Sequence, residues 1–384
     1  MFNIDLLNKF RSLNTPFYYY DLDILKENLN SLKASLNDKN KVHFALKSNF
    51  NSKVLGVIKS YGLGIDAVSG NEIKKAIEVG FKPKDIVFAG VGKTDGEIKL
   101  SIDNNISYLN CESPQEIEVI NNFSSKVDKV TKISIRINPN IKTDTHKNIQ
   151  TGHRNNKFGI DLNDLNEIID SAKKLNNIEV IGFHFHLGSQ ISEKSPFLKL
   201  CHVANNVNSL FKNKSIDVKF INVGGGLAID YKDPIDNRIS NFQTFIDIFN
   251  KNIFLNDRQL LHFELGRSIV GQCGFLISKI LFTKKSYNKN FVIVDAGMND
   301  LVRPALYDSY HKIINISSNE SDMINYDVVG PICESSDTFV NDYSLPRSKR
   351  GDFIVICSAG AYGESMSSNY NLRNKLKSYY SDTI

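Results

Sequence analysis

The sequence predicts an α/β protein in which a (β/α)8 barrel is followed by a mostly antiparallel β domain. Through the first two thirds of the 384 residues, eight short β-branched or aromatic runs alternate with longer amphipathic stretches. After about residue 269, strand-like runs follow one another with turns and few helical patterns. Strict alternation of strands and helices indicates a parallel sheet covered by helices, and eight repeats fit a closed barrel.

Each barrel strand is expected where a short apolar run is bounded by turn residues. The alternative architecture for this alternation is an open doubly-wound sheet. The eight expected strands are Val42–Leu46, Gly64–Val68, Ile86–Ala89, Tyr108–Cys111, Ile133–Ile137, Val180–His186, Phe220–Val223 and Leu261–Glu264. Helical periodicity between them includes Ile24–Leu36, Glu72–Val79, Ser113–Phe123, Leu162–Leu175 and Phe242–Lys251.

In the last third of the chain, the sequence pattern predicts strands at Gly274–Thr283, Asn290–Val294, Tyr326–Val329 and Asp352–Cys357. No linker or low-complexity segment separates this part from the barrel, so we expect the two parts to pack tightly. The expected domains are a barrel over residues 18–268 and a β domain over residues 269–384, with residues 1–17 packing on the β domain.

Composition excludes several classes of protein. The content of 41% hydrophobic and 23% charged residues is that of a soluble globular protein. The net charge of +5 comes from scattered lysines, so we expect no nucleic-acid partner. No apolar run approaches the length that spans a bilayer, and the N-terminus lacks a signal-peptide pattern, which predicts a cytoplasmic protein without a membrane partner. Five widely spaced cysteines without a C-x-x-C pair argue against a disulfide framework and a cysteine zinc site.

Two motifs at expected strand ends could bind a phosphorylated cofactor. Lys47 closes the first barrel strand, where a barrel places its working residues, and burial would free its amine for covalent chemistry. A solvated rim charge is the simpler interpretation of this lysine. Gly224-Gly225-Gly226 follows the seventh strand and would expose backbone N–H groups to a phosphate. A plain tight turn explains this motif equally well when it is read alone.

Strands six and eight carry further polar groups. Glu264, in Glu-Leu-Gly-Arg267, could keep a pyridinium nitrogen protonated, although a structural ion pair with Arg267 is the alternative. His184 and His186 occupy alternate positions of strand six and are expected to face the same side. We expect no metal there, because no third ligand stands at a supporting spacing. A ring-stacking histidine suits a flat cofactor better, and Ser189 could add a hydroxyl to a phosphate.

The stretch from Asp295 to His311 is too polar and irregular to be explained by packing. Pro304 directly follows Arg303, and the residue before proline is pushed towards extended geometry, so we expect Arg303 on an extended segment. With Tyr307 close behind, this arginine suits fork-like recognition of a carboxylate.

Two loops complete the candidate site. Cys333 stands beside Glu334 in a polar loop after Gly330-Pro-Ile, which favours a proton donor or nucleophile over a buried cysteine. Tyr362 lies in the small-residue turn Ser-Ala-Gly-Ala-Tyr-Gly and is free to point its hydroxyl into a site.

The order of these motifs resembles the decarboxylases that depend on pyridoxal 5'-phosphate (PLP) and have an alanine-racemase-like barrel, and most closely the diaminopimelate decarboxylases. The likeness extends from about Thr15 to Asn371, and the segments 295–311 and 330–339 are the most specific. It implies PLP-dependent decarboxylation of meso-2,6-diaminopimelate to L-lysine and CO2, in a homodimer with shared active sites.

The resemblance also implies a role for each candidate residue. Lys47 would hold PLP, His186 would stack on its ring and Glu264 would pair with the pyridine nitrogen. Cys333, from the partner subunit, would protonate the α-carbon, and Asp66 would support the surroundings of Lys47. The cofactor phosphate would be held by Ser189, Gly225, Gly226, the backbone of Glu264, Leu265, Gly266 and Arg267, and Tyr362. The distal end of the substrate would be bound by Arg267, Arg303, Tyr307, Tyr362 and Glu334.

The sequence departs from the family pattern at Leu265, where proline is usual, and at Ser48, where alanine is common. The chain also ends soon after Asn371, where the family continues with another strand and helix, so we expect a less stable β domain. Decarboxylases of the same fold that act on ornithine, arginine or carboxynorspermidine are the alternative, although Arg303 does not suit a distal cation. A non-catalytic PLP-binding protein and an amino-acid racemase are further alternatives. Cys333 argues against both.

Overall fold

The computed structural model describes residues 2–142, 152 and 156–384, which form two compact units. We call the first the β unit; it comprises Met1–Asn28, Ile229–Ser240 and Arg267–Ile384. We call the second the barrel unit; it comprises Leu29–Ala228 and Asn241–Gly266. Residues 18–28, 229–240 and 267–268, which the expected boundaries assigned to the barrel, therefore lie in the β unit.

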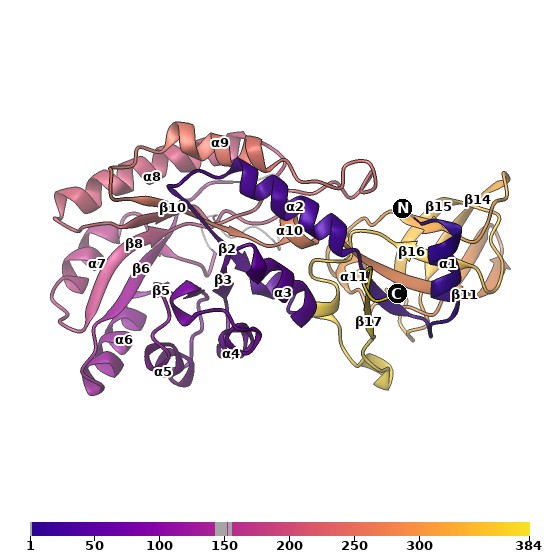
Figure 1. Ribbon diagram of the computed structural model, residues 1–384, viewed down its shortest axis with the longest axis horizontal. Helices are drawn as coiled ribbons and strands as arrows, with labels where there is room; N and C mark the ends of the chain where they lie inside the picture. The colour runs from indigo at the N-terminus through magenta and orange to yellow at the C-terminus, as the bar shows by residue number, and fades with distance from the viewer. Residues whose placement is uncertain (1, 143–151, 153–155) are drawn as a thin grey trace. The chain divides into compact units, whose positions relative to one another are not determined.

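The barrel unit contains a closed barrel of eight parallel strands, which confirms the predicted fold class (Figure 1). The sheet order is β5-β4-β3-β2-β10-β9-β8-β6, and pairing of β5 with β6 closes it. All eight predicted strands are present. They are β2 Asn40–Ala45, β3 Gly64–Ala67, β4 Ile86–Phe88, β5 Tyr108–Cys111, β6 Thr131–Asn138, β8 Ile178–His184, β9 Phe220–Asn222 and β10 Leu260–Leu265. The two-residue strand β7 Ile160–Asp161 pairs in parallel with the end of β6.

Helices follow the barrel strands and lie outside them (Figure 1). Their N-termini carry the expected caps: Ser69 accepts a bond from Glu72 N, and Thr94 forms a capping box with Glu97. Helices α3, α5 and α8 were not among the helical patterns named from the sequence. The helices are α2 Leu22–Ser35, α3 Ser52–Ser60, α4 Gly70–Val79, α5 Asp95–Asp103, α6 Pro114–Lys126, α7 Leu165–Ala172, α8 Ser195–Asn213 and α9 Phe242–Asn252.

Strand alternation divides the barrel residues into an apolar outer face and an interior in which polar side chains lie beside apolar ones such as Phe220. On the outer face, Phe263 of β10 packs against Phe245 and Phe249 of α9, with ring centroids 5.9 and 5.6 Å apart. In the interior, the Tyr108 hydroxyl of β5 lies 3.0 Å from Nδ1 of His262 of β10. Because β5 and β10 are not neighbours in the sheet, this contact crosses the interior. A barrel interior is more often filled by branched apolar side chains, so polar residues here require hydrogen-bond partners.

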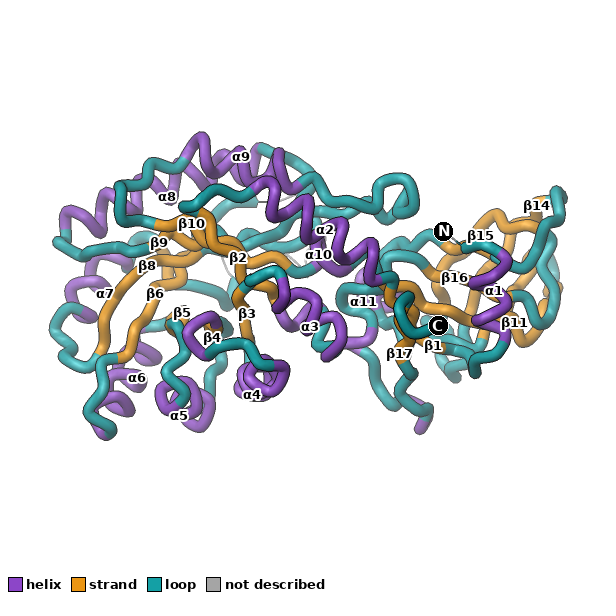
Figure 2. Tube along the Cα trace, viewed as in Figure 1, coloured by secondary structure: helices purple, strands orange, loops and turns teal. Residues whose placement is uncertain are grey.

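The β unit consists mainly of strands with few helices (Figure 2). Its sheet is mostly antiparallel and has the order β13-β16-β11-β12-β14-β15. Strand β1 pairs antiparallel with β11 and parallel with β17, so this sheet joins the first and last strands of the chain. The strands are β1 Phe17–Tyr20, β11 Gly274–Ser286, β12 Lys289–Val294, β13 Ile313–Asn315, β14 Met323–Val329, β15 Thr338–Pro346, β16 Phe353–Ile356 and β17 Ser378–Tyr380. The helices are α1 Ile4–Arg11, α10 Arg267–Val270 and α11 Arg303–Tyr307.

One local prediction was wrong. Arg303 is not extended but begins helix α11, with Pro304 in its first turn. Proline is compatible with that turn because its missing N–H has no helical partner there, and the restriction on the preceding residue is a preference that a short helix can overcome. Across the ranges the structure describes, helices long and apolar enough to cross a membrane are absent.

Candidate active site

The barrel unit brings Lys47 and two buried carboxylates to neighbouring strand ends. Strand β2 runs directly into the 3-10 turn Leu46–Ser48, which carries Lys47. Its neighbours are β10, which carries Glu264, and β3, which carries Asp66. Both carboxylates are buried, and burial raises the pKa of each, whereas the positive charge of Lys47 lowers both. The carboxyl ends of parallel barrel strands are where this fold places its chemistry.

Glu264 is held in one orientation by two side chains from neighbouring elements. Its Oε1 accepts a hydrogen bond of 2.8 Å from the Asn222 amide, and its Oε2 lies 2.9 Å from Nε2 of His184. Burial keeps the pKa of His184 well below its usual range, so this histidine is neutral and donates through Nε2. Of the potential partners described, none bonds to Nδ1 of His184. The local sequence pattern marked His184 only as half of a histidine pair and did not indicate a role for Asn222.

The glycine run is explained by close backbone approach. A Cβ on Gly225 would lie 1.9 Å from the Glu264 carbonyl oxygen, and one on Gly224 would lie 2.4 Å from the Phe185 carbonyl oxygen. Gly224 N also donates to Oδ1 of Asn222, at 2.9 Å. Asn222 therefore connects the start of the run to the Glu264 carboxylate.

His186 lies beyond the end of β8 and contacts the glycine run. The strand ends at His184, so the two histidines do not share one strand face as expected. Nδ1 of His186 accepts a hydrogen bond of 3.3 Å from Gly225 N. Burial and the charge of Lys47 lower the pKa of His186, so the ring is neutral. Ser189 is half-buried and lies at a bend of the chain beyond His186.

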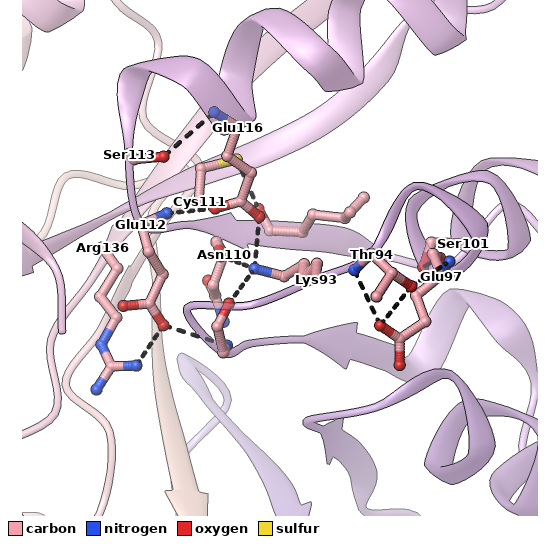
Figure 3. Close-up of polar contacts among 12 residues, drawn as sticks. Lys93, Thr94, Glu97, Ser101, Asn110, Cys111, Glu112, Ser113, Glu116 and Arg136 are labelled. Atoms are coloured by element: carbon pink, nitrogen blue, oxygen red, sulfur yellow. Dashed lines mark hydrogen bonds and ion pairs between the residues drawn. The ribbon is translucent and has the colours of Figure 1, made fainter. Parts of the chain in front are cut away.

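A second set of buried charges joins the ends of β4, β5 and β6 (Figure 3). Oε1 of Glu112 accepts bonds from Arg136 at 2.6 Å and from Gly90 N at 3.2 Å, and Oε2 accepts one from Gly159 N at 2.9 Å. Beside this pair, Lys93 donates to Glu116 at 2.6 Å. Arg136 acts on the site through its charge, because it lowers the pKa values of Asp66, Glu264 and both histidines.

In the β unit, two buried arginines lie in an aromatic cluster. Arg267 and Arg303 are each 5% exposed. The Arg267 guanidinium lies 4.9 Å from the Tyr362 ring centroid, and that of Arg303 lies 5.8 Å from the Tyr307 ring centroid. Burial lowers the pKa of Arg303, and the like charge of Arg267 contributes. The structure thus gathers four of the predicted substrate residues into one cluster.

Cys333 and Glu334 are both exposed on the loop between β14 and β15. Cys333 N donates to Asn371 Oδ1 at 3.1 Å, and the Tyr370 hydroxyl donates to Glu334 at 2.5 Å. Clusters of three or more potential metal ligands do not occur among residues 2–142, 152 and 156–384.

The chain matches the family model described as "Pyridoxal-dependent decarboxylase, pyridoxal binding domain" over residues 22–271. It is 47% identical to the diaminopimelate decarboxylase of Bacteroides thetaiotaomicron, over 98% of both chains. It is 41% identical to that of Helicobacter pylori, over 98% of this chain and 92% of that protein. The chain therefore belongs to the pyridoxal-dependent decarboxylases and, within them, to the diaminopimelate decarboxylases.

Solved structures agree with this assignment. The diaminopimelate decarboxylase of Helicobacter pylori complexed with L-lysine has a TM-score of 0.91 at 39% identity and covers 97% of this chain and 93% of that one. The enzyme from M. jannaschii in complex with L-lysine has a TM-score of 0.90 at 31% identity, with 98% and 89% covered. A viral arginine decarboxylase at 20% identity, with a TM-score of 0.88, shows the shared fold alone.

The cofactor of this family is PLP, and the barrel unit contains groups that fit it. Lys47 supplies an amine at a strand end, and the buried Glu264 supplies a carboxylate for a pyridinium nitrogen. The glycine run provides a close backbone approach that any Cβ would fill. Gly266 allows a similar approach, because a Cβ there would lie 2.8 Å from Ser48 Oγ, in the turn that carries Lys47. Leu265 is the last residue of β10 and pairs with Phe44 of β2.

Proposed function

We propose that this protein decarboxylates meso-2,6-diaminopimelate to L-lysine and CO2, with PLP as cofactor. Support comes from relatives named diaminopimelate decarboxylase that align over nearly the whole chain, and from their structures complexed with L-lysine. The product L-lysine retains one intact amino-acid end. The site must therefore hold that end while CO2 leaves the other.

PLP, when bound, acts as an electron sink for the electron pair left behind by CO2. In our proposal, Lys47 holds the cofactor through its amine, and His186 packs on the ring. Glu264, fixed by Asn222 and His184, pairs with the pyridine nitrogen and stabilises the proton there. Burial strengthens this pairing, because charges interact more strongly where water is excluded. Asp66 supports the charge of Lys47 from the adjacent strand.

The phosphate of the cofactor would be held mainly by backbone groups. We assign this role to Gly225, Gly226, Ser189 and the backbone from Glu264 to Arg267, with the Tyr362 hydroxyl as a further donor. Successive N–H groups make a concave anion site. Glycine is required at positions 224 and 225 because a Cβ there would collide with the carbonyl oxygens of Phe185 and Glu264.

The observation that carries the substrate assignment is the buried guanidinium of Arg303. Within the described residues, its hydrogen bonds go to His311 and Ser309, and it forms no ion pair with a carboxylate. A buried cation without a counter-charge is costly, so such a site favours an incoming anion. We assign the distal carboxylate of the substrate to Arg303, Arg267, Tyr307 and Tyr362. A substrate that ends in a cation, such as ornithine, would be repelled.

We further propose a homodimer with shared active sites, in which Cys333 and Glu334 serve the partner's substrate. Both side chains are exposed, as residues that act across an interface must be in a single chain. Cys333 would deliver a proton from Sγ to the carbon that loses CO2, and Glu334 would bind the distal ammonium group. We also propose a cytoplasmic location, which suits the five free cysteines.

The test is CO2 release from meso-diaminopimelate and from L-ornithine, with PLP added, by wild type, Lys47→Ala and the control Lys33→Ala. Lys33 is an exposed lysine of α2. We expect turnover of diaminopimelate only, a loss of at least about 1000-fold in Lys47→Ala and no change in Lys33→Ala. Comparable turnover of ornithine would refute the substrate assignment, and full activity of Lys47→Ala would refute the mechanism.

A further inference from the structure

Tyr231 has no role in the assignments above, although it contacts two of the arginines assigned to the substrate. It follows the glycine run by five residues and belongs to Ile229–Ser240, the short segment of the β unit that interrupts the barrel sequence. The segment leaves the barrel unit after Ala228 and returns at Asn241. Tyr231 is thus tied by a few residues of chain to the expected phosphate loop.

Tyr231 contacts both buried arginines. Its hydroxyl accepts a hydrogen bond of 2.5 Å from Arg267. Its ring centroid lies 5.9 Å from the Arg267 guanidinium and 5.5 Å from that of Arg303. The ring of His311, which accepts a bond from Arg303, meets Tyr231 edge-on at 5.1 Å. Tyr231 is therefore a partner common to the two guanidinium groups.

The two positive charges of this buried cluster are stabilised by a partner that contacts both. Arg267 and Arg303 repel each other, and this repulsion contributes to the lowered pKa of Arg303, which the nearby Tyr231 opposes. An aromatic face attracts cations, and a guanidinium that stacks on a ring is restricted in orientation. With its ring near both guanidinium groups and its hydroxyl bonded to Arg267, Tyr231 limits the directions in which both arginines can present their N–H groups.

Tyr231 is itself held in place by its turn. The preceding Asp230 accepts bonds from Lys232 N at 2.8 Å, Asp233 N at 3.0 Å and Asn237 at 2.8 Å. Gln272 donates to the Asp230 carbonyl at 2.8 Å and accepts from Ser358 at 2.6 Å. The backbone on both sides of Tyr231 is thus fixed independently of the arginines.

We propose that Tyr231 is a positioning residue for carboxylate recognition, which aligns Arg267 and Arg303 and so sets the preference for a substrate with a distal carboxylate. This inference rests on the proposed function and goes beyond it, because it places selectivity in a residue that need not touch the substrate. A carboxylate binds best to guanidinium groups whose donors are already aligned. Loss of the ring should weaken binding of the distal carboxylate and leave the reacting end unaffected.

The test compares Tyr231→Phe and Tyr231→Leu with the control pair Tyr326→Phe and Tyr326→Leu. Tyr326 is a buried tyrosine of the β unit whose hydroxyl accepts a bond from Ser348 N. One arm measures kcat and KM for meso-diaminopimelate and for D-lysine, which has the same reacting carbon without the distal carboxylate. The second arm measures the Kd of L-lysine, which has that carboxylate, and of cadaverine, which lacks it.

We expect KM for diaminopimelate and Kd for L-lysine to rise about 2- to 10-fold in Tyr231→Phe, which loses one charge-assisted bond. In Tyr231→Leu the rise should reach about 20- to 100-fold, because both ring contacts are also lost. We expect kcat to change less than about 2-fold, and D-lysine and cadaverine to be unaffected. Both Tyr326 variants should retain the wild-type preference for the carboxylate.

Several results would overturn the inference. It fails if the Tyr231 variants bind L-lysine and cadaverine with equally weakened affinity, or if their kcat falls at constant KM. It also fails if wild type does not bind L-lysine, or if the Tyr326 variants lose the preference for L-lysine over cadaverine. Failure of the proposed function is separate, because it would appear as wild type that releases no CO2 from diaminopimelate. The binding arm decides the role of Tyr231 even then.

Discussion

The buried ion pair of Glu112 and Arg136 gives a quantitative prediction for the barrel. The side chains of Arg136 and Glu112 are 7% and 3% exposed, and the carboxylate accepts three hydrogen bonds (Figure 3). In Glu112→Gln, one oxygen becomes an NH2 group, which must face either the guanidinium or an amide N–H. Breaking a buried pair in this way costs about 3–5 kcal/mol, because it leaves the other charge uncompensated. We therefore expect the free energy of unfolding to fall by that amount.

The assay is urea unfolding followed by far-UV circular dichroism. With a slope of roughly 3 kcal/mol per molar urea, the midpoint should fall by about 1–1.7 M. The control Glu78→Gln removes an exposed i,i+3 pair with Lys75 and should shift the midpoint by less than about 0.3 M. A double-mutant cycle with Arg136→Met should give a coupling energy above about 1.5 kcal/mol. Equal shifts in Glu112→Gln and Glu78→Gln, or a coupling energy near zero, would refute the reasoning.

Three further variants test the barrel interior. Gly225→Ala, whose Cβ would lie 1.9 Å from a carbonyl oxygen, should lower the unfolding free energy by more than about 2 kcal/mol and weaken PLP binding, measured by absorbance titration. The control Gly56→Ala, which has open space around its Cβ in α3, should be neutral or stabilising. Equal effects of the two substitutions would contradict the prediction. Asn222→Leu should cost about 2–4 kcal/mol in urea unfolding, because the buried Glu264 carboxylate and an N–H lose partners, and wild-type stability would argue against that role. Burial lowers the pKa of His43 to about 3, so the unfolded chain binds more protons than the folded chain between pH 3 and 6.5. The free energy of unfolding should therefore fall as the pH falls through that window, and His43→Leu should make this fall shallower by up to about 1.4 kcal/mol per pH unit. An unchanged slope in His43→Leu would exclude this contribution.

The barrel could be predicted from the sequence because its strands have a local pattern. In Val42-His43-Phe44-Ala45, an apolar residue on the outer face alternates with a side chain of the interior, and each strand ends at a turn residue. The same pattern did not reveal the partners of the interior residues. His262 meets Tyr108 across 154 positions of sequence, and such contacts follow from barrel closure rather than from any local signal.

The site residues could likewise be predicted where a local pattern marks them, and not where only the folded chain brings them together. Lys47 and Glu264 stand at strand ends, where the barrel architecture itself indicates their use. Asn222 could have been found from its place two residues before the first of three glycines, since a short amide there can accept a hydrogen bond from the backbone of the turn. Tyr231 gave no such signal, because its importance depends on two arginines that lie 36 and 72 positions later. The extended geometry predicted for Arg303 was wrong because a rule for isolated dipeptides was applied to the first turn of a helix.

The pairing of β1 has a consequence for how the nascent chain folds. Tyr18 lies opposite Leu276 of β11 and opposite Ser378 of β17, so the first strand to leave the ribosome waits for both neighbours. At about 5–20 residues per second, synthesis reaches β11 roughly 15–50 s later and β17 later still. During this interval the aromatic run Phe17–Tyr20 has no sheet to join. The N-terminal strand therefore stays without its sheet partners until the whole barrel, which lies between β1 and β11 in the sequence, has been synthesised.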